Sequence, residues 1–252
     1  MASHKFKDIP PNTDFLLKLA PVIAGIRIYH QHSTVGLENF PKSGCIVAAN
    51  HSLASYDIAL LMASIYEHTN RIPRGLIDRL FFKVPGVGQI MEALGNREGT
   101  KENAIKMLSE GEIIVVAPGG MREALRPSSQ KYKIMWDHRK GFAKLAIETG
   151  VPIVLAACPA ADDLYDIAPS HVTAWAYKTF KIPVFFAKGF GLSPIPKPVK
   201  LTHFLSEPMM PPANSDDPEV FNKRLEEFHH KIVDRMASLM TETDKKHAGA
   251  RK

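Results

Sequence analysis

The sequence predicts a single α/β domain in which helices flank a mainly parallel central sheet. Two observations predict this fold class. Short apolar runs of nearly continuous hydrophobicity recur along the chain, as in strands that are buried on both faces of a sheet. Helical patterns separate these runs, and such alternation is typical of layered α/β folds. The expected strands are residues 45–49, 113–117, 152–157 and 182–186.

The expected helices are residues 57–67, 100–110 and 138–149, and a last helix begins at Asp217. Thr100 is a suitable N-cap for the second helix, and Gly150 is a suitable residue to end the third. The last helix carries apolar residues at three- and four-residue steps, which predicts that it packs on the domain. These residues are Phe221, Leu225, Phe228, Ile232, Met236 and Leu239.

Three parts of the chain are expected: an apolar or amphipathic helical segment at residues 1–34, the folded domain at 35–240 and a polar tail at 241–252. The most apolar stretch, residues 15–29, is interrupted by Lys18, Pro21 and Arg27, which favours a surface helix over a membrane span. Membrane contact and simple docking on the domain both remain open. Because residues 1–12 lack a signal-peptide pattern, we expect a cytoplasmic protein, peripheral at the inner face of the membrane.

The formal charge of +6 and the pI near 9.2 favour acidic partners, such as phosphate-bearing molecules and anionic lipids. Nucleic acid is not expected as a partner, because the basic residues are spread along the chain without a known binding pattern. Cys45 and Cys158 match no metal or redox spacing. The sequence motifs of serine hydrolases, NTPases, dinucleotide-binding enzymes and zinc proteases are absent.

The first candidate site follows the strand expected at residues 45–49, where Asn50 and His51 lead toward Asp57 at a helix start. Open α/β sheets bind ligands at the carboxyl ends of their strands. An imidazole there can act as a general base, and a nearby carboxylate can fix its tautomer and orientation. In the alternative interpretation, Asp57 only caps the helix and His51 is an ordinary loop histidine.

The second candidate site follows the strand expected at residues 113–117. Gly119 and Gly120 let the backbone approach a ligand closely, and Arg122, next to Glu123, offers a planar donor for phosphate or carboxylate. The alternative is a tight turn with a solvated arginine.

The third candidate site is the loop at residues 94–100, where Arg97 precedes a helix N-terminus and would complete an anion site. The alternative is a surface arginine that pairs with Glu98 or Glu102.

Taken in order, these loops resemble the blocks of the glycerolipid acyltransferase superfamily, the lysophospholipid acyltransferase-like proteins related to bacterial lysophosphatidate acyltransferases. The resemblance covers about residues 35–208 and implies a glycerol-phosphate acyltransferase-like fold. The counterparts of the family's blocks are Asn50-His51 with Asp57, Gly95 to Arg97, Pro118 to Arg122, and Val151-Pro152-Ile153.

The resemblance implies an O-acyltransferase that moves a fatty acyl group from acyl-CoA, or from acyl-carrier protein, to the hydroxyl of a lysophospholipid, glycerol phosphate or diacylglycerol at a membrane surface. His51 would be the general base and Asp57 its partner, with no metal ion and no cofactor beyond the co-substrate. Arg122 and Arg97 would hold phosphate. The N–H groups near Gly119 and Gly120 would stabilise the oxyanion of the tetrahedral intermediate. The implied substrate-binding residues are Arg97, Gly119, Gly120, Arg122 and Glu123.

Two departures from the family pattern stand out. Five residues separate His51 from Asp57, where the family has four, so their direct pairing is a hypothesis. Gly119 stands where the phosphate-acceptor enzymes carry Glu, and with Glu123 the block looks more like the diacylglycerol acyltransferase and transmembrane-protein-68-like branch. These departures leave two alternatives open: an inert lipid-binding protein of the same fold, and a hydrolase of thioesters or esters.

Overall fold

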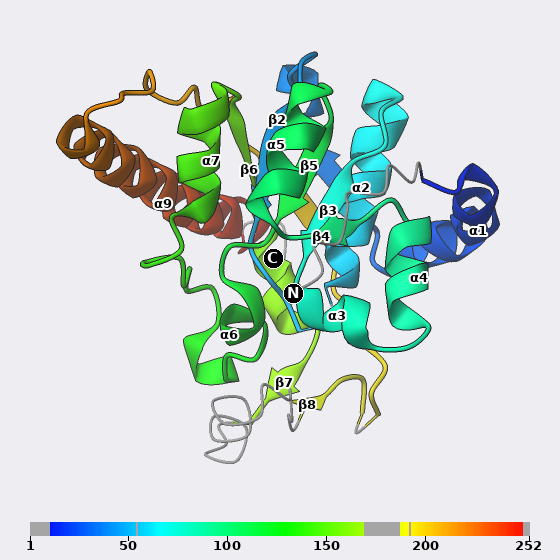
Figure 1. Ribbon diagram of the computed structural model, residues 1–252. Coiled ribbons are helices and arrows are strands. Elements are labelled where there is room, and N and C mark those ends of the chain that lie inside the picture. Colours follow the sequence, from blue (N-terminus) through cyan, green and yellow to red (C-terminus); the bar gives the residue numbers. More distant parts are fainter. Residues whose placement is uncertain (1–10, 54, 169–186, 192, 249–252) are drawn as a thin grey trace.

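The computed structural model describes residues 11–53, 55–168, 187–191 and 193–248, and its centre is a seven-stranded sheet (Figure 1). The strand order is β1-β9-β6-β2-β5-β3-β4, and every neighbouring pair is parallel except β6 with β9. The strands are β1 (Ser33–Val35), β2 (Cys45–Ala49), β3 (Arg74–Ile77), β4 (Arg97–Glu98), β5 (Ile113–Val116), β6 (Ile153–Ala157) and β9 (Thr202–Leu205). The predicted fold class, a mainly parallel sheet flanked by helices, is confirmed.

The helices join the strands and cover both faces of the sheet (Figure 1). They are α1 (Thr13–Tyr29), α2 (Tyr56–Thr69), α3 (Arg79–Lys83), α4 (Val87–Ala93), α5 (Lys101–Ser109), α6 (Gly120–Ala124), α7 (Gly141–Thr149) and α9 (Pro218–Ala248). Short 3-10 turns lie at Leu37–Asn39, Ser128–Gln130 and Pro159–Asp163, and a small separate ribbon pairs β7 (Asp166–Ile167) with β8 (Ala187–Lys188). The strand predicted at residues 182–186 lies outside the described residues.

The central strands β2 and β6 are buried along their whole length, which explains their continuous hydrophobicity. Alternate residues of β2 face opposite sides. Ile46 and Ala48 join a core with α5, α7 and α9, whereas Val47 and Ala49 join a core with α2. Burial of a side chain such as Ile46 or Val47 contributes about 1.5–3 kcal/mol of transfer free energy, so the strand that ends at the first candidate loop is held firmly from both faces.

Local signals set most of the helix boundaries. The Thr100 hydroxyl accepts a bond from the Asn103 N–H, and Gly150, at a φ of +71°, ends α7 as predicted. α7 begins at Gly141 rather than at residue 138, because a turn from the Trp136 carbonyl to the Arg139 N–H precedes it. α9 continues through residue 248, into the segment predicted as a polar tail, since no Pro or Gly interrupts it there.

The two terminal helices are packed differently. The apolar stripe of α9 is buried as predicted, and its members include Leu225, Phe228 and Ile232. α1 has no fully buried residue, although Ile23 and Ile26 pack against the domain. Among the helices of the described residues, none is both long enough and apolar enough to cross a membrane. α1 is therefore a docked surface helix.

Candidate active site

The first two candidate loops meet at the middle of the sheet, because β2 and β5 are parallel neighbours and their carboxyl ends lie at the same edge. The His51 loop follows β2, and residues 117–120 lead from β5 into α6. Asn50 fixes the first loop to the end of β6: its amide donates to the Cys158 carbonyl (3.1 Å) and accepts from the Cys158 N–H (2.8 Å). A buried asparagine therefore ties together two strand ends that are distant in sequence.

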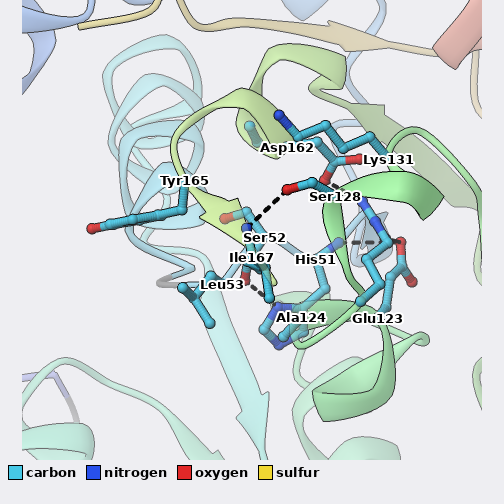
Figure 2. A pocket seen from close by; sticks show the side chains of 12 residues that line it. His51, Ser52, Leu53, Glu123, Ala124, Ser128, Lys131, Asp162, Tyr165 and Ile167 are labelled. Atoms are coloured by element: carbon cyan, nitrogen blue, oxygen red, sulfur yellow. Dashed lines mark hydrogen bonds and ion pairs between the residues drawn. The ribbon is translucent and has the colours of Figure 1, made fainter. Parts of the chain in front are cut away.

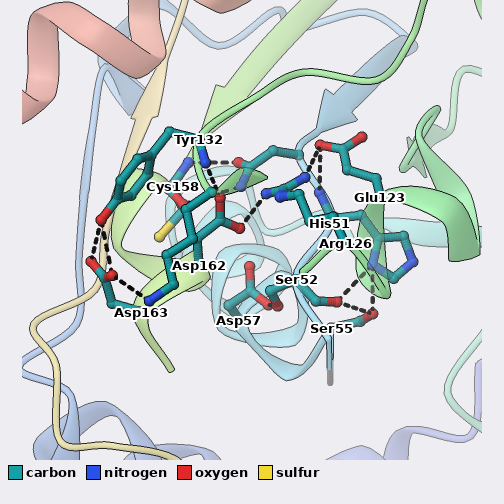
Figure 3. A network of polar contacts seen from close by, with 12 residues as sticks. His51, Ser52, Ser55, Asp57, Glu123, Arg126, Tyr132, Cys158, Asp162 and Asp163 are labelled. Carbon is teal, nitrogen blue, oxygen red and sulfur yellow. Dashed lines mark hydrogen bonds and ion pairs between the residues drawn. The ribbon is translucent and has the colours of Figure 1, made fainter. Parts of the chain in front are cut away.

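His51 is held in one tautomer by its own loop. Its Nδ1 lies 2.8 Å from the Ser52 carbonyl oxygen and 3.2 Å from the Ser55 hydroxyl (Figure 3). A carbonyl oxygen only accepts, so Nδ1 carries the proton and Nε2 is left as an acceptor. Burial lowers the pKa of His51, the Ser52 carbonyl opposes this shift, and the charge of Arg126 adds to it. The imidazole is thus neutral at neutral pH, as a general base must be.

The structure places no direct hydrogen bond between His51 and Asp57, both of which it describes. The Asp57 Oδ1 accepts from the Ser52 hydroxyl at 2.5 Å, and burial raises the pKa of Asp57 to about 6. The loop, one residue longer than the family pattern, turns through Ser55 at a φ of +54° before α2 begins. The hypothesis of direct pairing is therefore replaced by an indirect connection, in which Ser52 bonds Asp57 through its hydroxyl and His51 through its carbonyl (Figure 3).

Glu123, predicted to bind substrate, is fully buried and bonded to protein groups. Its carboxylate accepts from the Trp136 Nε1–H at 2.9 Å, pairs with Arg126 at 3.0 Å and lies 3.4 Å from the backbone nitrogen of His51. A Cβ at Gly119 would lie 1.5 Å from the Glu123 Oε2, so the carboxylate fills the space of a side chain at residue 119. Gly119 is required for this arrangement, and Glu123, which also lines the pocket beside His51, supports the His51 loop.

The two glycines differ in the availability of their N–H groups. The Gly120 N–H donates to the Ala117 carbonyl at 3.0 Å, and Gly120 has a φ of +54°. A turn thus already uses the Gly120 N–H, and its role toward an oxyanion stays a prediction. For the Gly119 N–H, no partner occurs within the described residues, so its predicted role stays a prediction.

A narrow pocket of about 20 Å³ opens beside His51 (Figure 2). This is room for about one water-sized group. The loops after β2, β5 and β6 all contribute to its wall. The polar residues of the wall are His51, Ser52, Glu123, Arg126, Ser128, Lys131, Asp162 and Tyr165.

The arginine in this pocket is Arg126, which the sequence analysis missed. Its guanidinium is buried between the carboxylates of Glu123 and Asp162 (Figure 3). Arg122, predicted to hold phosphate, is exposed on α6 and does not line the pocket. Arg126 belongs to no motif in the sequence. Its four-residue spacing from Arg122 is the signal that could have indicated it.

Arg97, the third predicted site residue, lies on the edge strand β4 and is separated from β2 by β3 and β5. It is buried, and its Nη1 donates to the Asn96 carbonyl at 2.7 Å. The structure therefore brings the first two candidate loops together. The third candidate loop lies apart from them, at the last strand of the sheet. Within the described residues, no group of three or more His, Cys, Asp or Glu is placed to hold a metal ion.

Comparison with known families decides the classification. The sequence profile of the family described as Acyltransferase matches residues 32–158, half of the chain, and this span includes the loops that carry His51 and Glu123. The chain belongs to this acyltransferase family. The family predicted from the order of the sequence blocks is thereby confirmed.

Relatives of this acyltransferase include proteins named for storage-lipid synthesis. A human protein named "DGAT1/2-independent enzyme synthesizing storage lipids" is 30% identical over 184 residues, which cover 72% of this chain and 55% of the relative. Diacylglycerol O-acyltransferase 1 of Saccharomyces cerevisiae is 30% identical over 135 residues, 48% of this chain and 32% of that protein. The chain thus spans about half the length of the human relative.

Among solved structures, the 1-acyl-sn-glycerophosphate acyltransferase PlsC of Thermotoga maritima matches with a TM-score of 0.48 and 21% identity. The match covers 88% of this acyltransferase and 83% of the PlsC chain.

Proposed function

We propose that this acyltransferase transfers a fatty acyl group from acyl-CoA or acyl-carrier protein to the hydroxyl of a glycerolipid, with His51 as the general base. The observation that carries the proposal is the bond from the His51 Nδ1 to the Ser52 carbonyl at 2.8 Å. This bond leaves Nε2 unprotonated, and the residue lines the pocket at the carboxyl edge of the sheet.

The reaction follows from this arrangement. Nε2 of His51 removes the proton of the acceptor hydroxyl as its oxygen attacks the thioester carbonyl carbon. A C–O bond forms, the C–S bond breaks, and the departing thiolate takes the proton back from the imidazolium. The Glu123 carboxylate, 3.4 Å from the His51 backbone nitrogen, holds the loop in place during this exchange.

The pocket favours a neutral acceptor of the diacylglycerol type. Arg126 is neutralised by Glu123 and Asp162, and Lys131 pairs with Asp163 at 3.1 Å. The described pocket wall thus offers no uncommitted cation to the phosphate of an acceptor. The names of the human and yeast relatives support the same choice. Arg122 and Arg97 stay candidates for the phosphates of the acyl donor.

Contact with a membrane surface is the second part of the proposal. α1 exposes large apolar side chains, among them Leu17 (66% exposed) and Ile28 (78% exposed). Such a helix can lie in the interface of a lipid surface while its other face stays on the protein. The position at the inner face of the membrane remains a prediction.

The decisive experiment compares the wild type with His51→Ala in a labelled acyl-CoA assay, with diacylglycerol, lysophosphatidate and glycerol 3-phosphate as acceptors in micelles. Loss of a general base lowers the rate about a hundred- to ten-thousandfold. His230→Ala, which removes an exposed histidine of α9, is the matched control and keeps full activity.

Three results would contradict the proposal. Retention of most activity in His51→Ala excludes the mechanism. Release of free fatty acid without an acceptor identifies a hydrolase. Failure of the wild type to acylate any acceptor from either acyl-CoA or acyl-carrier protein, with liposome binding intact, identifies an inert lipid-binding protein.

A further inference from the structure

Behind Asp57, two buried histidines form a chain of polar groups that the acyl-transfer mechanism does not use. His203 lies on β9 and is 1% exposed. The parallel pairing of β1 with β9 brings His32, next to β1, against it: the His32 Nε2 lies 3.0 Å from the His203 Nδ1. The other nitrogen of His203, Nε2, lies 3.9 Å from the Oδ2 of Asp57, which is also 1% exposed.

The atoms that face each other across this gap are both unsatisfied. Within the described residues, neither the Asp57 Oδ2 nor the His203 Nε2 has a hydrogen-bond partner. A buried polar atom without a partner is destabilising. A closer approach of less than 1 Å would satisfy both atoms with one bond. The arrangement is therefore a hydrogen-bonded chain with one link nearly made.

The outer end of the chain reaches a second groove of about 420 Å³. His32 lines this groove together with Arg27, Ser64, Glu67 and His68. The His32 Nδ1 is itself buried, so a proton reaches it only when the ring moves toward the groove, and it has no hydrogen-bond partner within the described residues. Arg27 and Glu67 neutralise each other at 2.6 Å. The chain therefore connects a groove lined by titratable side chains with the carboxylate that supports the His51 loop.

The tautomers of His32 and His203 must change together. Burial lowers the pKa of His203 to about 3 and that of His32 to about 4, so both rings are neutral at neutral pH and each carries one N–H. If Asp57 is ionised, His203 donates to it from Nε2 and must accept at Nδ1 from the His32 Nε2–H. If Asp57 is protonated, it donates to His203 instead, and both rings hold their proton on Nδ1.

We propose that His32 and His203 form a proton path that sets the charge of Asp57 from the second groove, and through Ser52 the position of His51. A proton enters at the His32 Nδ1, the His32 Nε2 proton moves to the His203 Nδ1, and the His203 Nε2 proton moves to the Asp57 Oδ2. The chain gains one proton in total: a proton is taken up at His32, both rings stay neutral, and Asp57 ends protonated. The catalytic part of this inference rests on the proposed function, whereas the proton path does not.

Other titratable groups surround the path and are part of the proposal. They are Arg27, His30 and Glu67 beside His32, and Tyr56, Cys158 and Asp162 beside Asp57. Neither His203 nor His32 touches the pocket wall, so both are positioning residues and not catalytic ones.

The first test is independent of activity. Nitrogen-15 NMR of the histidine side chains in the full chain reports which ring nitrogen carries the proton. We expect His203 and His32 to switch tautomer together near the pKa of Asp57, about 6, and to stop switching in Asp57→Asn. Rings that keep one tautomer between about pH 5 and pH 8, or that switch unchanged in Asp57→Asn, overturn the proposal.

The second test uses acyl transfer. His203→Gln replaces the group that faces the Asp57 Oδ2, and His32→Gln replaces the partner that orients it. Both changes alter the free energy of protonating Asp57, so we expect the acidic limb of the kcat/KM profile to move by about one pH unit. A purely structural histidine would lower the rate equally at every pH, and that result overturns the proposal. If either variant fails to fold, the NMR test on the wild type decides. Retained activity in His51→Ala with coupled tautomers would reject only the proposed function.

Discussion

Asp57 and Glu123 are both carboxylates with at most 1% exposure beside the His51 loop, yet their surroundings differ. Glu123 has a guanidinium, an indole N–H and a backbone N–H around it. Asp57 has the Ser52 hydroxyl at Oδ1 and no hydrogen-bond partner at Oδ2 within the described residues. Burial raises the pKa of both carboxyl groups. At Glu123 the charge of Arg126 opposes that shift, whereas at Asp57 only hydrogen bonds from the Ser52 hydroxyl and from nearby backbone N–H groups oppose it.

The difference teaches how one loop can be both rigid and adjustable. A buried charge is costly unless it is paired and hydrogen-bonded. Glu123 meets this condition, so it anchors the backbone of His51. Asp57 does not meet this condition. Its pKa of about 6 lies close to neutral pH, so its charge can respond to a neighbour such as His203.

The largest expected effect on stability is that of Glu123→Gln. Gln keeps the volume and can still accept from Trp136, but it leaves Arg126 buried with only Asp162 as its counter-charge. We expect a loss of about 3–5 kcal/mol in the free energy of unfolding, measured by urea denaturation. Glu226→Gln, at an exposed pair with Lys140, should leave the urea midpoint unchanged. A loss no larger than that of the control would show that Glu123 is no anchor.

Asp57→Asn should have a smaller, pH-dependent effect. The pKa of Asp57 is raised from 3.8 to about 6, so between these values the unfolded chain releases its proton first and the wild type loses stability as the pH rises. Asn does not titrate, so the variant gains about 3 kcal/mol at most relative to the wild type from about pH 4 to pH 7. Urea denaturation at several pH values measures this gain. Asp234→Asn, at an exposed site on α9, is the control.

If the difference in unfolding free energy between Asp57→Asn and the wild type does not change over that pH range, the contrast between Asp57 and Glu123 is removed. Asp57 would then be as well compensated as Glu123, and the open link to His203 would have no energetic basis.

The smallest expected effect is that of Trp136→Phe, which removes one donor from the Glu123 Oε2 and keeps most of the apolar ring. An unsatisfied buried acceptor costs about 1–3 kcal/mol. A double-mutant cycle with Glu123→Gln isolates the bond between the two side chains. Additive losses would show that the indole contributes only packing and that Arg126 alone compensates Glu123.

The fold was predictable where the pattern is local. The strands at β2, β5 and β6 are fully or largely buried, and their apolar runs stand out against the helices between them. The strands β1, β3, β4 and β9 have two to four residues and carry no such pattern, so they were missed. The antiparallel pairing of β9 with β6 was also beyond the sequence, because no residue pattern fixes which neighbour a short strand takes.

The site was predictable in its loops but not in its contacts. The sequence located the loop that carries His51 and the turn at residues 117–120, and the parallel pairing of β2 and β5 joined them. The sequence indicated Arg122 and not Arg126. Which arginine reaches the pocket depends on where the chain turns after α6, and no motif shows this. It also expected Glu123 to meet substrate, whereas packing directs the carboxylate into the space beside Gly119.

The sequence by itself determined the layered α/β architecture, the family and His51 as the candidate base, because these depend on apolar periodicity and on short motifs. Only the tertiary structure decided which atom of each side chain meets which partner. His32 and His203 are 171 residues apart and meet because β1 and β9 pair, and Trp136 reaches Glu123 because both lie in the same buried layer. Hydrogen bonds form over about 3 Å, and distances of that size between distant segments are set by packing alone.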